Sequence, residues 1–181
     1  TINPTVNNIT NHSSKFLAIK DFDNTQKEAF FTKLYAQTTN GSTPLREALS
    51  RIGRYYAGKT DGINANMIST ADLDPIQYSC QQNFTIISTD GYWNGNSGVN
   101  LSGTEIKNSE DATDSGYSAR TAGAYDGGLV DSKDNSGNLA DIAMYYYKTD
   151  LRTTGALAEN NVPISAIDKN QSQHMVTYAI S

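Results

Sequence analysis

The sequence predicts an α/β fold with a mostly parallel sheet and helices on both of its faces, and three observations support this. Two short apolar runs, residues 83–89 and 174–180, have the composition of buried strands. Segments that begin near residues 25, 43 and 139 carry apolar side chains at helical spacing. The helical and strand segments alternate along the chain, which is typical of βαβ units with parallel strands.

Size and charge narrow the classes of function. A chain of 181 residues with 37% hydrophobic residues is long enough for one domain with a core. A net charge of -5 and scattered basic residues argue against nucleic acid as a partner, because phosphate binding needs clustered Lys and Arg. No stretch has the apolar length of a membrane span.

The first helix is expected after a polar start and a short strand or extended lead-in at residues 16–20. Thr25 and Glu28 have the spacing of a capping box, which predicts a helix start at that point. Apolar residues follow at helical spacing and predict one buried face, made by Phe30, Phe31, Leu34 and Tyr35.

The second helix is expected from about Thr43 to Tyr56, with Pro44 at its first helical position. Its apolar stripe is predicted to consist of Leu45, Ala48, Leu49, Ile52 and Tyr56.

The rest of the chain contains one long irregular stretch. Strand 83–89 is followed by residues 92–137, which are rich in Gly, Ser, Asn and Asp and are too long for an ordinary connection. We interpret them as a loop-rich insertion. A helix over residues 139–147 and a buried strand over residues 174–180 complete the pattern, and Leu139, Ile142, Ala143 and Tyr146 mark the buried side of that helix.

Thr43 and Asp90 are the candidate ligands of a metal ion. Asp90 comes directly after strand 83–89, and ligands of parallel sheets gather beyond the carboxyl ends of the strands. Thr43 lies at the start of the second helix. We interpret the two segments as two of the three loops of a metal-ion-dependent adhesion site. Two alternatives stay open: Thr43 as an ordinary helix N-cap, and Asp90 as part of an Asp-Gly turn.

Five blocks, residues 30–35, 41–55, 88–95, 139–148 and 173–178, carry a family resemblance. In this order they are similar to the PilY1/PilC group of type IV pilus tip adhesins and biogenesis factors, in the von Willebrand factor A-like part near their N-termini. The resemblance implies a Rossmann-like A domain that is extracellular and carried at the pilus tip or cell surface. It also implies that Thr43 matches the threonine of the second loop and Asp90 the aspartate of the third.

The family's first loop, Asp-x-Ser-x-Ser after the opening strand, has no counterpart here. Residues 21–25 offer oxygen ligands but precede a capping box instead of following a strand. We therefore expect residues 1–181 to be a partial A-like domain, with residues 92–137 inserted in it. The expected ion is Mg²⁺ or another divalent cation, bound weakly or not at all without the first loop. A sheet that lacks a central strand also predicts an unstable chain in isolation.

The function implied is adhesion and pilus biogenesis through this metal site, without catalysis. Implied partners are pilus proteins such as minor pilins, a host or abiotic surface receptor, and the remainder of the same polypeptide. The alternative is a structural pilus-assembly module with no functional metal site.

An enzyme of the hydrolase class would need His174 beside Cys80 or a serine, because His12 lies in the polar start of the chain. Cys80 itself has two interpretations: a buried free thiol, or a partner for a cysteine outside the chain. The acids of the insertion lack the spacing of a calcium loop and are interpreted as solvated charges. They are Asp111, Asp114, Asp126, Asp131 and Asp134.

Overall fold

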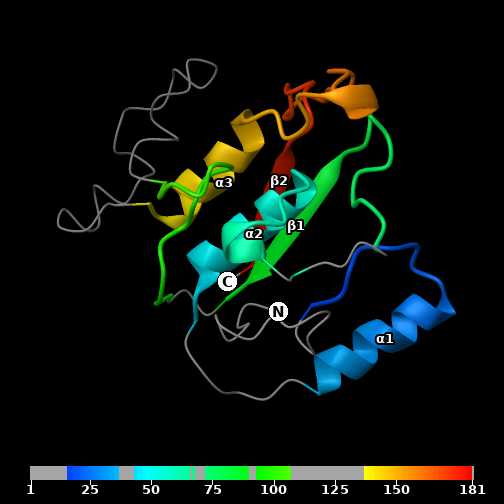
Figure 1. Cartoon of the computed structure of the whole chain (residues 1–181), viewed down its shortest axis with the longest axis vertical. Helices are drawn as coiled ribbons and strands as arrows, with labels where there is room; N and C mark the ends of the chain where they lie inside the picture. The colour runs from blue at the N-terminus through cyan, green and yellow to red at the C-terminus, as the bar shows by residue number, and fades with distance from the viewer. Residues whose placement is uncertain are drawn as a thin grey trace.

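The computed structural model describes residues 16–36, 43–65, 67, 72–89, 93–106 and 137–180. Within these residues there are three helices and two strands (Figure 1). Two single-turn 3₁₀ helices, η1 (Gly62–Asn64) and η3 (Gly155–Leu157), lie in the connections. In chain order the main elements are α1 (Asn24–Tyr35), α2 (Leu45–Tyr56), β1 (Asn83–Ser88), α3 (Leu139–Lys148) and β2 (Met175–Ile180).

The two strands pair in parallel, with Asn83 opposite Met175 and Ser88 opposite Ile180. This confirms both predicted strands and their direction. Parallel neighbours need a crossover connection, and α3 forms part of it. The observed architecture is therefore mixed α/β with a small parallel sheet.

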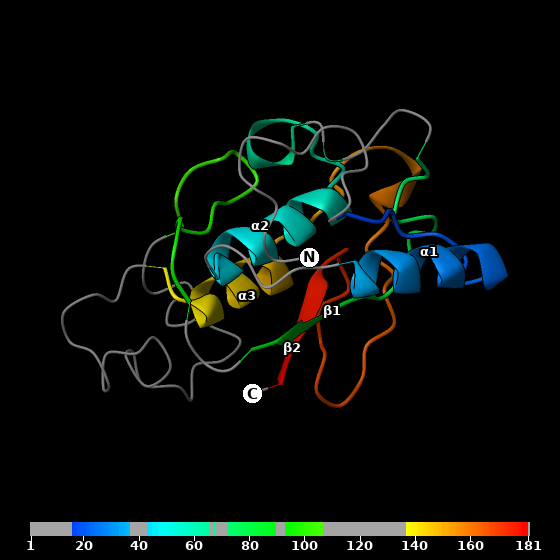
Figure 2. The same ribbon diagram turned by 90° about the horizontal axis from the view of Figure 1, so that it is seen from below.

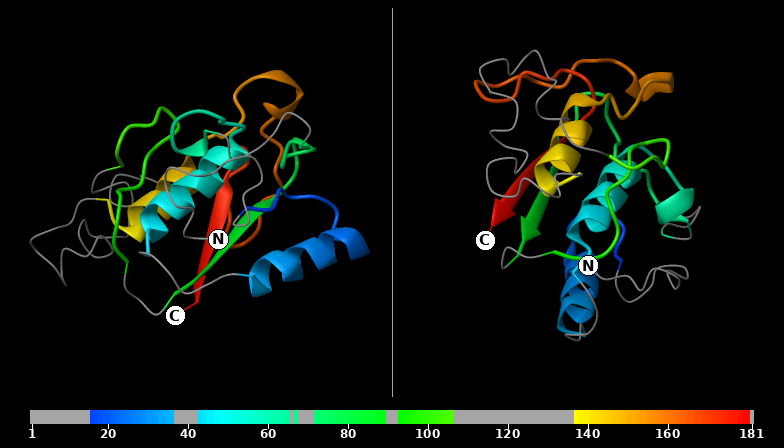
Figure 3. Two further views of the ribbon diagram at one scale, coloured as in Figure 1. Left: turned by 60° about the horizontal axis from the view of Figure 1, so that its bottom comes forward. Right: turned by 90° about the vertical axis from the view of Figure 1, so that its left-hand side faces the viewer.

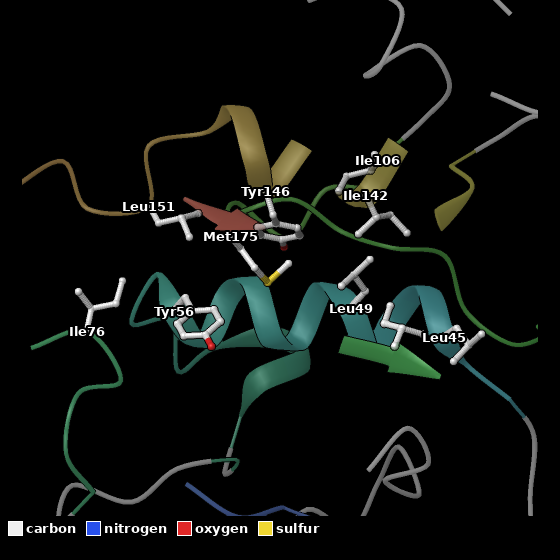
Figure 4. Packing of buried hydrophobic residues seen from close by; sticks show 10 residues of the cluster. Leu45, Leu49, Tyr56, Ile76, Ile106, Ile142, Tyr146, Leu151 and Met175 are labelled. Carbon is white, nitrogen blue, oxygen red and sulfur yellow. The ribbon is translucent and has the colours of Figure 1, made fainter. Parts of the chain in front are cut away.

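Helices α2 and α3 lie together on one face of this sheet (Figures 2 and 3). The main core forms where they meet it. Figure 4 shows Leu45 and Leu49 of α2 facing Ile142 and Tyr146 of α3, with Met175 of β2 between them. The predicted stripe of α2 is buried except for Ile52, which is half-buried, and the predicted inner side of α3 is likewise buried or half-buried.

Gly53 sets how closely the two helices approach. A Cβ atom at this position would overlap the ring of Tyr146, whose side chain is fully buried. The Tyr146 hydroxyl donates to the carbonyl oxygen of Val99 at 2.6 Å. The Leu101 amide donates to the Tyr145 hydroxyl at 3.1 Å. Tyr146 thus packs in the core, as predicted, and Tyr145 and Tyr146 also hold Leu101 and Val99 of the predicted insertion.

The prediction of helices on both faces is wrong for the described residues. On the face of the sheet away from α2 and α3, Phe84 and Ile86 of β1 are 48% and 68% exposed, and Tyr178 and Ile180 of β2 are also exposed. Helix α1 lies beside the sheet instead of on it (Figure 2).

The predicted buried face of α1 is also wrong, because α1 has no buried residue. Its aromatic side chains stack mainly with one another: Phe30 contacts Phe31, and Phe31 stacks on Tyr35. The helix starts earlier than the Thr25 capping box predicted. The Asp23 side chain caps it by accepting from the Gln26 amide at 2.8 Å.

The segments that connect the helices and strands agree with some of the predictions and differ from others. Residues 16–20 form no strand, so the extended lead-in is the correct alternative. Of the predicted insertion, residues 93–106 form ordered loops with a bridge between Val99 and Glu105. The five insertion acids and His12 lie outside the described residues, and the insertion boundaries stay a prediction. Cys80 is exposed, so its interpretation as a buried thiol is wrong.

Candidate functional site

The start of α2 and the loop after β1 meet at the carboxyl end of the sheet. The Thr43 amide donates to Asn94 Oδ1 at 2.6 Å, and the Asn94 amide donates back to the Thr43 carbonyl oxygen at 3.0 Å. Asn94 comes four residues after Asp90. The two segments that were predicted to share a site are therefore joined by a reciprocal pair of hydrogen bonds.

The first turn of α2 holds the next two residues of the same loop. Arg46 donates to the carbonyl oxygen of Gly95 at 3.2 Å. Gly95 has a φ of 88° and lies against Pro44, so a side chain there would be strained. Asn96 donates to Glu47 Oε2 at 2.6 Å.

Glu47 is buried and satisfied on both oxygens. Its Oε1 accepts from Arg51, one turn further along α2, and both side chains are almost fully buried. A buried ion pair of this kind is costly to disrupt, because removing one partner leaves an uncompensated charge. The pair fixes the carboxylate that anchors Asn96, and so it fixes the course of the loop.

Thr43 does not act as the cap of α2. The N-cap is Pro44, with a φ of -82° and a ψ of 60°, and no side-chain hydrogen bond caps the helix. The capping alternative for Thr43 is therefore wrong, and so is the placement of Pro44 at the first helical position. Thr43 instead contributes its backbone amide and carbonyl to the contact with Asn94.

Asp90 lies outside the described residues, so its relation to Thr43 stays a prediction. Thr89, directly before it, and residues 93–106 after it are described. The Thr89 amide donates to the Ile180 carbonyl oxygen at 3.0 Å and so extends the hydrogen bonding between β1 and β2. Trp93, directly before Asn94, is 41% exposed.

No three His, Cys, Asp or Glu side chains come together to hold a metal ion in the part of the chain that the structure describes. Asp23, from the segment considered as a substitute first loop, is used as the cap of α1. A hydroxyl and a carboxylate suit a hard cation such as Mg²⁺, which often takes one or two carboxylates and several waters. The side-chain types of Thr43 and Asp90 thus suit such an ion, and their role as its ligands stays a prediction.

The His174 side chain is buried and contacts groups that hold the chain together. It is 2% exposed, with Nδ1 2.7 Å from the Ser172 carbonyl oxygen and Nε2 3.0 Å from Asp168 Oδ2. The Tyr147 hydroxyl donates to the other oxygen of Asp168 at 3.0 Å. Both ring nitrogens are engaged with these oxygens, which ties the segment before β2 to the end of α3.

Sequence reasoning missed the residues that shape the site, namely Asn94, Asn96 and the Glu47–Arg51 pair. It also missed Arg54, whose fully buried guanidinium bonds the carbonyl oxygens of Asn100 and Leu101 at 2.9 and 2.8 Å. The spacing of Glu47 and Arg51 signals an ion pair on a helix. Nothing local in the sequence signals that a distant loop buries it.

Comparison with known proteins places the chain among relatives. No family model matches it, and no solved structure was found to match. Three curated proteins do match, and their class is that of type IV pilus biogenesis factors. Each is a PilY1 protein of Pseudomonas aeruginosa. The PAO1 protein is 32% identical over 136 residues and the UCBPP-PA14 protein 32% over 135, covering 74% and 75% of this chain.

The PilY1 protein of strain PAK is 29% identical over 135 residues, or 74% of the chain. The chain is thus homologous, over about three quarters of its length, to a segment of PilY1 and the expected resemblance is confirmed. The chain spans only 10% to 11% of the length of these relatives. Among the described residues, no helix is both long and apolar enough to cross a membrane.

Proposed function

We propose that this chain is part of a von Willebrand factor A-like adhesive domain of an extracellular pilus-tip factor. In this proposal Thr43 and Asp90 hold a divalent cation that binds partners. The observation that carries it is the reciprocal hydrogen bonding of Thr43 and Asn94, which joins the loop containing Asp90 to the start of α2. The homology to PilY1, named as a type IV pilus biogenesis factor, supports the setting.

The chemistry of the pair suits adhesion. One carboxylate and one neutral hydroxyl leave a divalent cation with a net charge of about +1 and with open positions. An acidic group of a partner then completes the shell. The amides at the N-terminus of α2 favour a negative group at this end of the sheet, because the helix dipole is positive there. Minor pilins, a surface receptor and the remainder of the polypeptide are the partners proposed.

A second candidate is a pilus-assembly module whose metal site does not function. One observation favours it: hydrogen bonds and the Glu47–Arg51 ion pair already hold the Thr43 and Asn94 segments, so an ion is not needed to fix them. Adhesion by the metal-replete protein that is unchanged in chelator supports this candidate and contradicts the adhesive one.

Calorimetric titration of Mn²⁺ or Mg²⁺ into the complete domain, with its first loop present, tests the metal site. We expect Thr43→Ala and Asp90→Ala each to weaken binding about tenfold or more, equivalent to about 1.4 kcal/mol. The control is Asp21→Ala, which removes an exposed carboxylate of the rejected first-loop substitute and leaves the affinity unchanged. Equal affinities for the complete wild-type domain and its Asp90→Ala variant remove Asp90 from the site.

A further inference from the structure

We propose that His174 carries a proton on both ring nitrogens in the folded protein, and that this charged ring and Asp168 form a pH-sensitive latch between α3 and β2. His174 lies directly before Met175, the first residue of β2, and is 2% exposed. Its Nδ1 lies 2.7 Å from the Ser172 carbonyl oxygen, and its Nε2 lies 3.0 Å from Asp168 Oδ2. Both distances are those of hydrogen bonds.

A neutral histidine ring cannot make both of these hydrogen bonds. In a neutral ring one nitrogen is a donor and the other is an acceptor. If Nδ1 donates to the Ser172 carbonyl oxygen, the lone pair of Nε2 faces a carboxylate oxygen, and two acceptors at 3.0 Å repel each other. The other tautomer moves the same conflict to the Ser172 carbonyl oxygen. Only a ring with both protons donates to both oxygens.

The remaining alternative is a protonated Asp168 that donates to a neutral ring, and the other contacts of Asp168 oppose it. Its Oδ1 accepts from the Tyr147 hydroxyl at 3.0 Å and from the Asn170 amide at 3.1 Å. Burial raises the pKa of Asp168, but the bond from the Asn170 amide and those from His174 and Tyr147 outweigh it and lower the pKa. Because Asp168 is therefore ionised, the second proton belongs to the ring.

The groups that contact His174 come from three segments. Asp168 and Ser172 belong to the segment before β2. Tyr147 of α3 packs edge-on against the imidazole, with the ring centroids 5.1 Å apart. Asn83 of β1 is neutral and donates to the His174 carbonyl oxygen at 3.1 Å. Asp168 and Tyr147 are the titratable groups in these contacts, and the Asp168 carboxylate supplies the negative charge that a buried imidazolium needs.

Loss of one ring proton opens the latch. The folded protein stabilises the doubly protonated ring, so both hydrogen bonds are complete at lower pH and one is lost as the pH rises. The segment that they hold also accepts two backbone hydrogen bonds from the connection between α3 and β2. The Leu151 amide donates to the Gln173 carbonyl oxygen at 2.8 Å, and the Val162 amide to that of Gln171 at 3.0 Å. These two amides should therefore become accessible when the latch opens.

The latch is separate from the candidate metal site. His174 precedes β2 and so lies at the amino end of the parallel sheet, whereas Thr43 and Asn94 meet at its carboxyl end. The inference therefore does not depend on the ion proposed at Thr43 and Asp90.

NMR of the ring nitrogens in the complete domain tests the charge of His174 directly. At about pH 7.5 an ordinary histidine is mostly neutral, because its pKa is about 6.5. We expect each ring nitrogen of His174 to carry a bonded hydrogen at this pH. The signals are assigned by their loss in His174→Gln and, without any substitution, by their contacts with the Tyr147 ring.

Two aspartate substitutions provide the matched comparison. Asp168→Asn removes the negative charge beside the ring, so one ring nitrogen should lose its hydrogen at the same pH. Asp21→Asn changes an exposed carboxylate and should leave both hydrogens in place.

Hydrogen exchange measures the opening of the latch. Between about pH 6 and about pH 9 we expect the protection factors of the Leu151 and Val162 amides, which correct for the intrinsic pH dependence of exchange, to fall about tenfold. His174→Gln should abolish this fall. The Asn94 amide, which is bonded to Thr43 at the other end of the sheet, should keep its protection.

Two outcomes overturn the proposal. One is a wild-type domain in which His174 has a ring nitrogen without hydrogen at about pH 7.5. The other is protection of Leu151 and Val162 that stays constant over this pH range, or falls equally in wild type and His174→Gln.

Discussion

At the scale of single residues, Asp168 shows how the segment before β2 is held. Its Oδ1 accepts from the Tyr147 hydroxyl at 3.0 Å and from the Asn170 amide at 3.1 Å, and its Oδ2 lies 3.0 Å from His174 Nε2. Burial raises the pKa of Asp168, but these hydrogen bonds outweigh it, with the Asn170 amide first, and hold the pKa below its ordinary value.

The lowered pKa of Asp168 predicts a specific acid sensitivity. Its stabilising contribution is fully present above the unfolded-state pKa, about 3.9, and is lost as the pH falls through the lower folded-state pKa. Asp168→Asn should therefore cost on the order of 1 kcal/mol in unfolding free energy at neutral pH and flatten the acid limb of the stability curve.

Urea unfolding between pH 2 and 7 measures this effect. The control is Asp21→Asn, at an exposed position with no described partner, and its curve should follow that of the wild type. An acid limb that is equally steep in wild type and Asp168→Asn contradicts the assignment.

At the scale of elements, the contact between α2 and α3 depends on one missing side chain. Gly53 lies against the ring of Tyr146, which is fully buried and bonded through its hydroxyl to Val99. Interiors are packed to near-crystalline density, so this contact has no room for a methyl group. The contact between Gly53 and Tyr146 thereby fixes which face of α2 and of α3 is turned toward the sheet.

Gly53→Ala distinguishes packing from helix propensity by the sign of its effect. Propensity alone predicts stabilisation of about 1 kcal/mol, because Ala is the better helix former. Overlap with Tyr146 predicts destabilisation of about 1–3 kcal/mol. Thermal or urea unfolding measures the difference.

The double variant Gly53→Ala/Tyr146→Leu provides the control for this prediction. A smaller side chain at position 146 makes room for the added methyl group, so part of the cost of Gly53→Ala should be recovered. A stabilised Gly53→Ala protein contradicts the close approach of α2 and α3.

The helices and strands were predictable where the evidence for them lies in their own residues. Apolar, β-branched density identified β1 and β2, and helical spacing identified α2 and α3 with their buried sides. The same spacing in α1 shows which residues share a side but not what covers them, and they are exposed. The burial of Glu47, Arg51 and Arg54 depends on loops distant in sequence, which no local pattern contains.

The meeting of the two segments at the candidate site could be predicted in the same way, whereas the metal ligands stay a prediction. A strand end and a helix start in an α/β pattern indicated that the Thr43 and Asp90 segments meet, and the bond between Thr43 and Asn94 agrees with this for the described residues. The hydrogen bonds that hold residues 94–96 against the start of α2 were not predictable, because they depend on the individual side chains of Arg46 and Glu47.

At the scale of the whole molecule, the described chain has one covered and one open sheet face, and its core lies between the sheet and helices α2 and α3. It is homologous to about a tenth of the length of PilY1. The proposed function depends on the carboxyl end of the sheet, where Thr43 and Asn94 join the start of α2 to the loop after β1.

Paramagnetic broadening by Mn²⁺ locates the proposed ion, because bound Mn²⁺ broadens the NMR signals of nearby amides. In the complete domain we expect selective broadening of Thr43, Thr89 and Asn94 at low ion concentration, with loss of the effect in Asp90→Ala. Broadening centred on the acids of residues 107–136, or unchanged in Asp90→Ala, would contradict a metal site formed by Thr43 and Asp90.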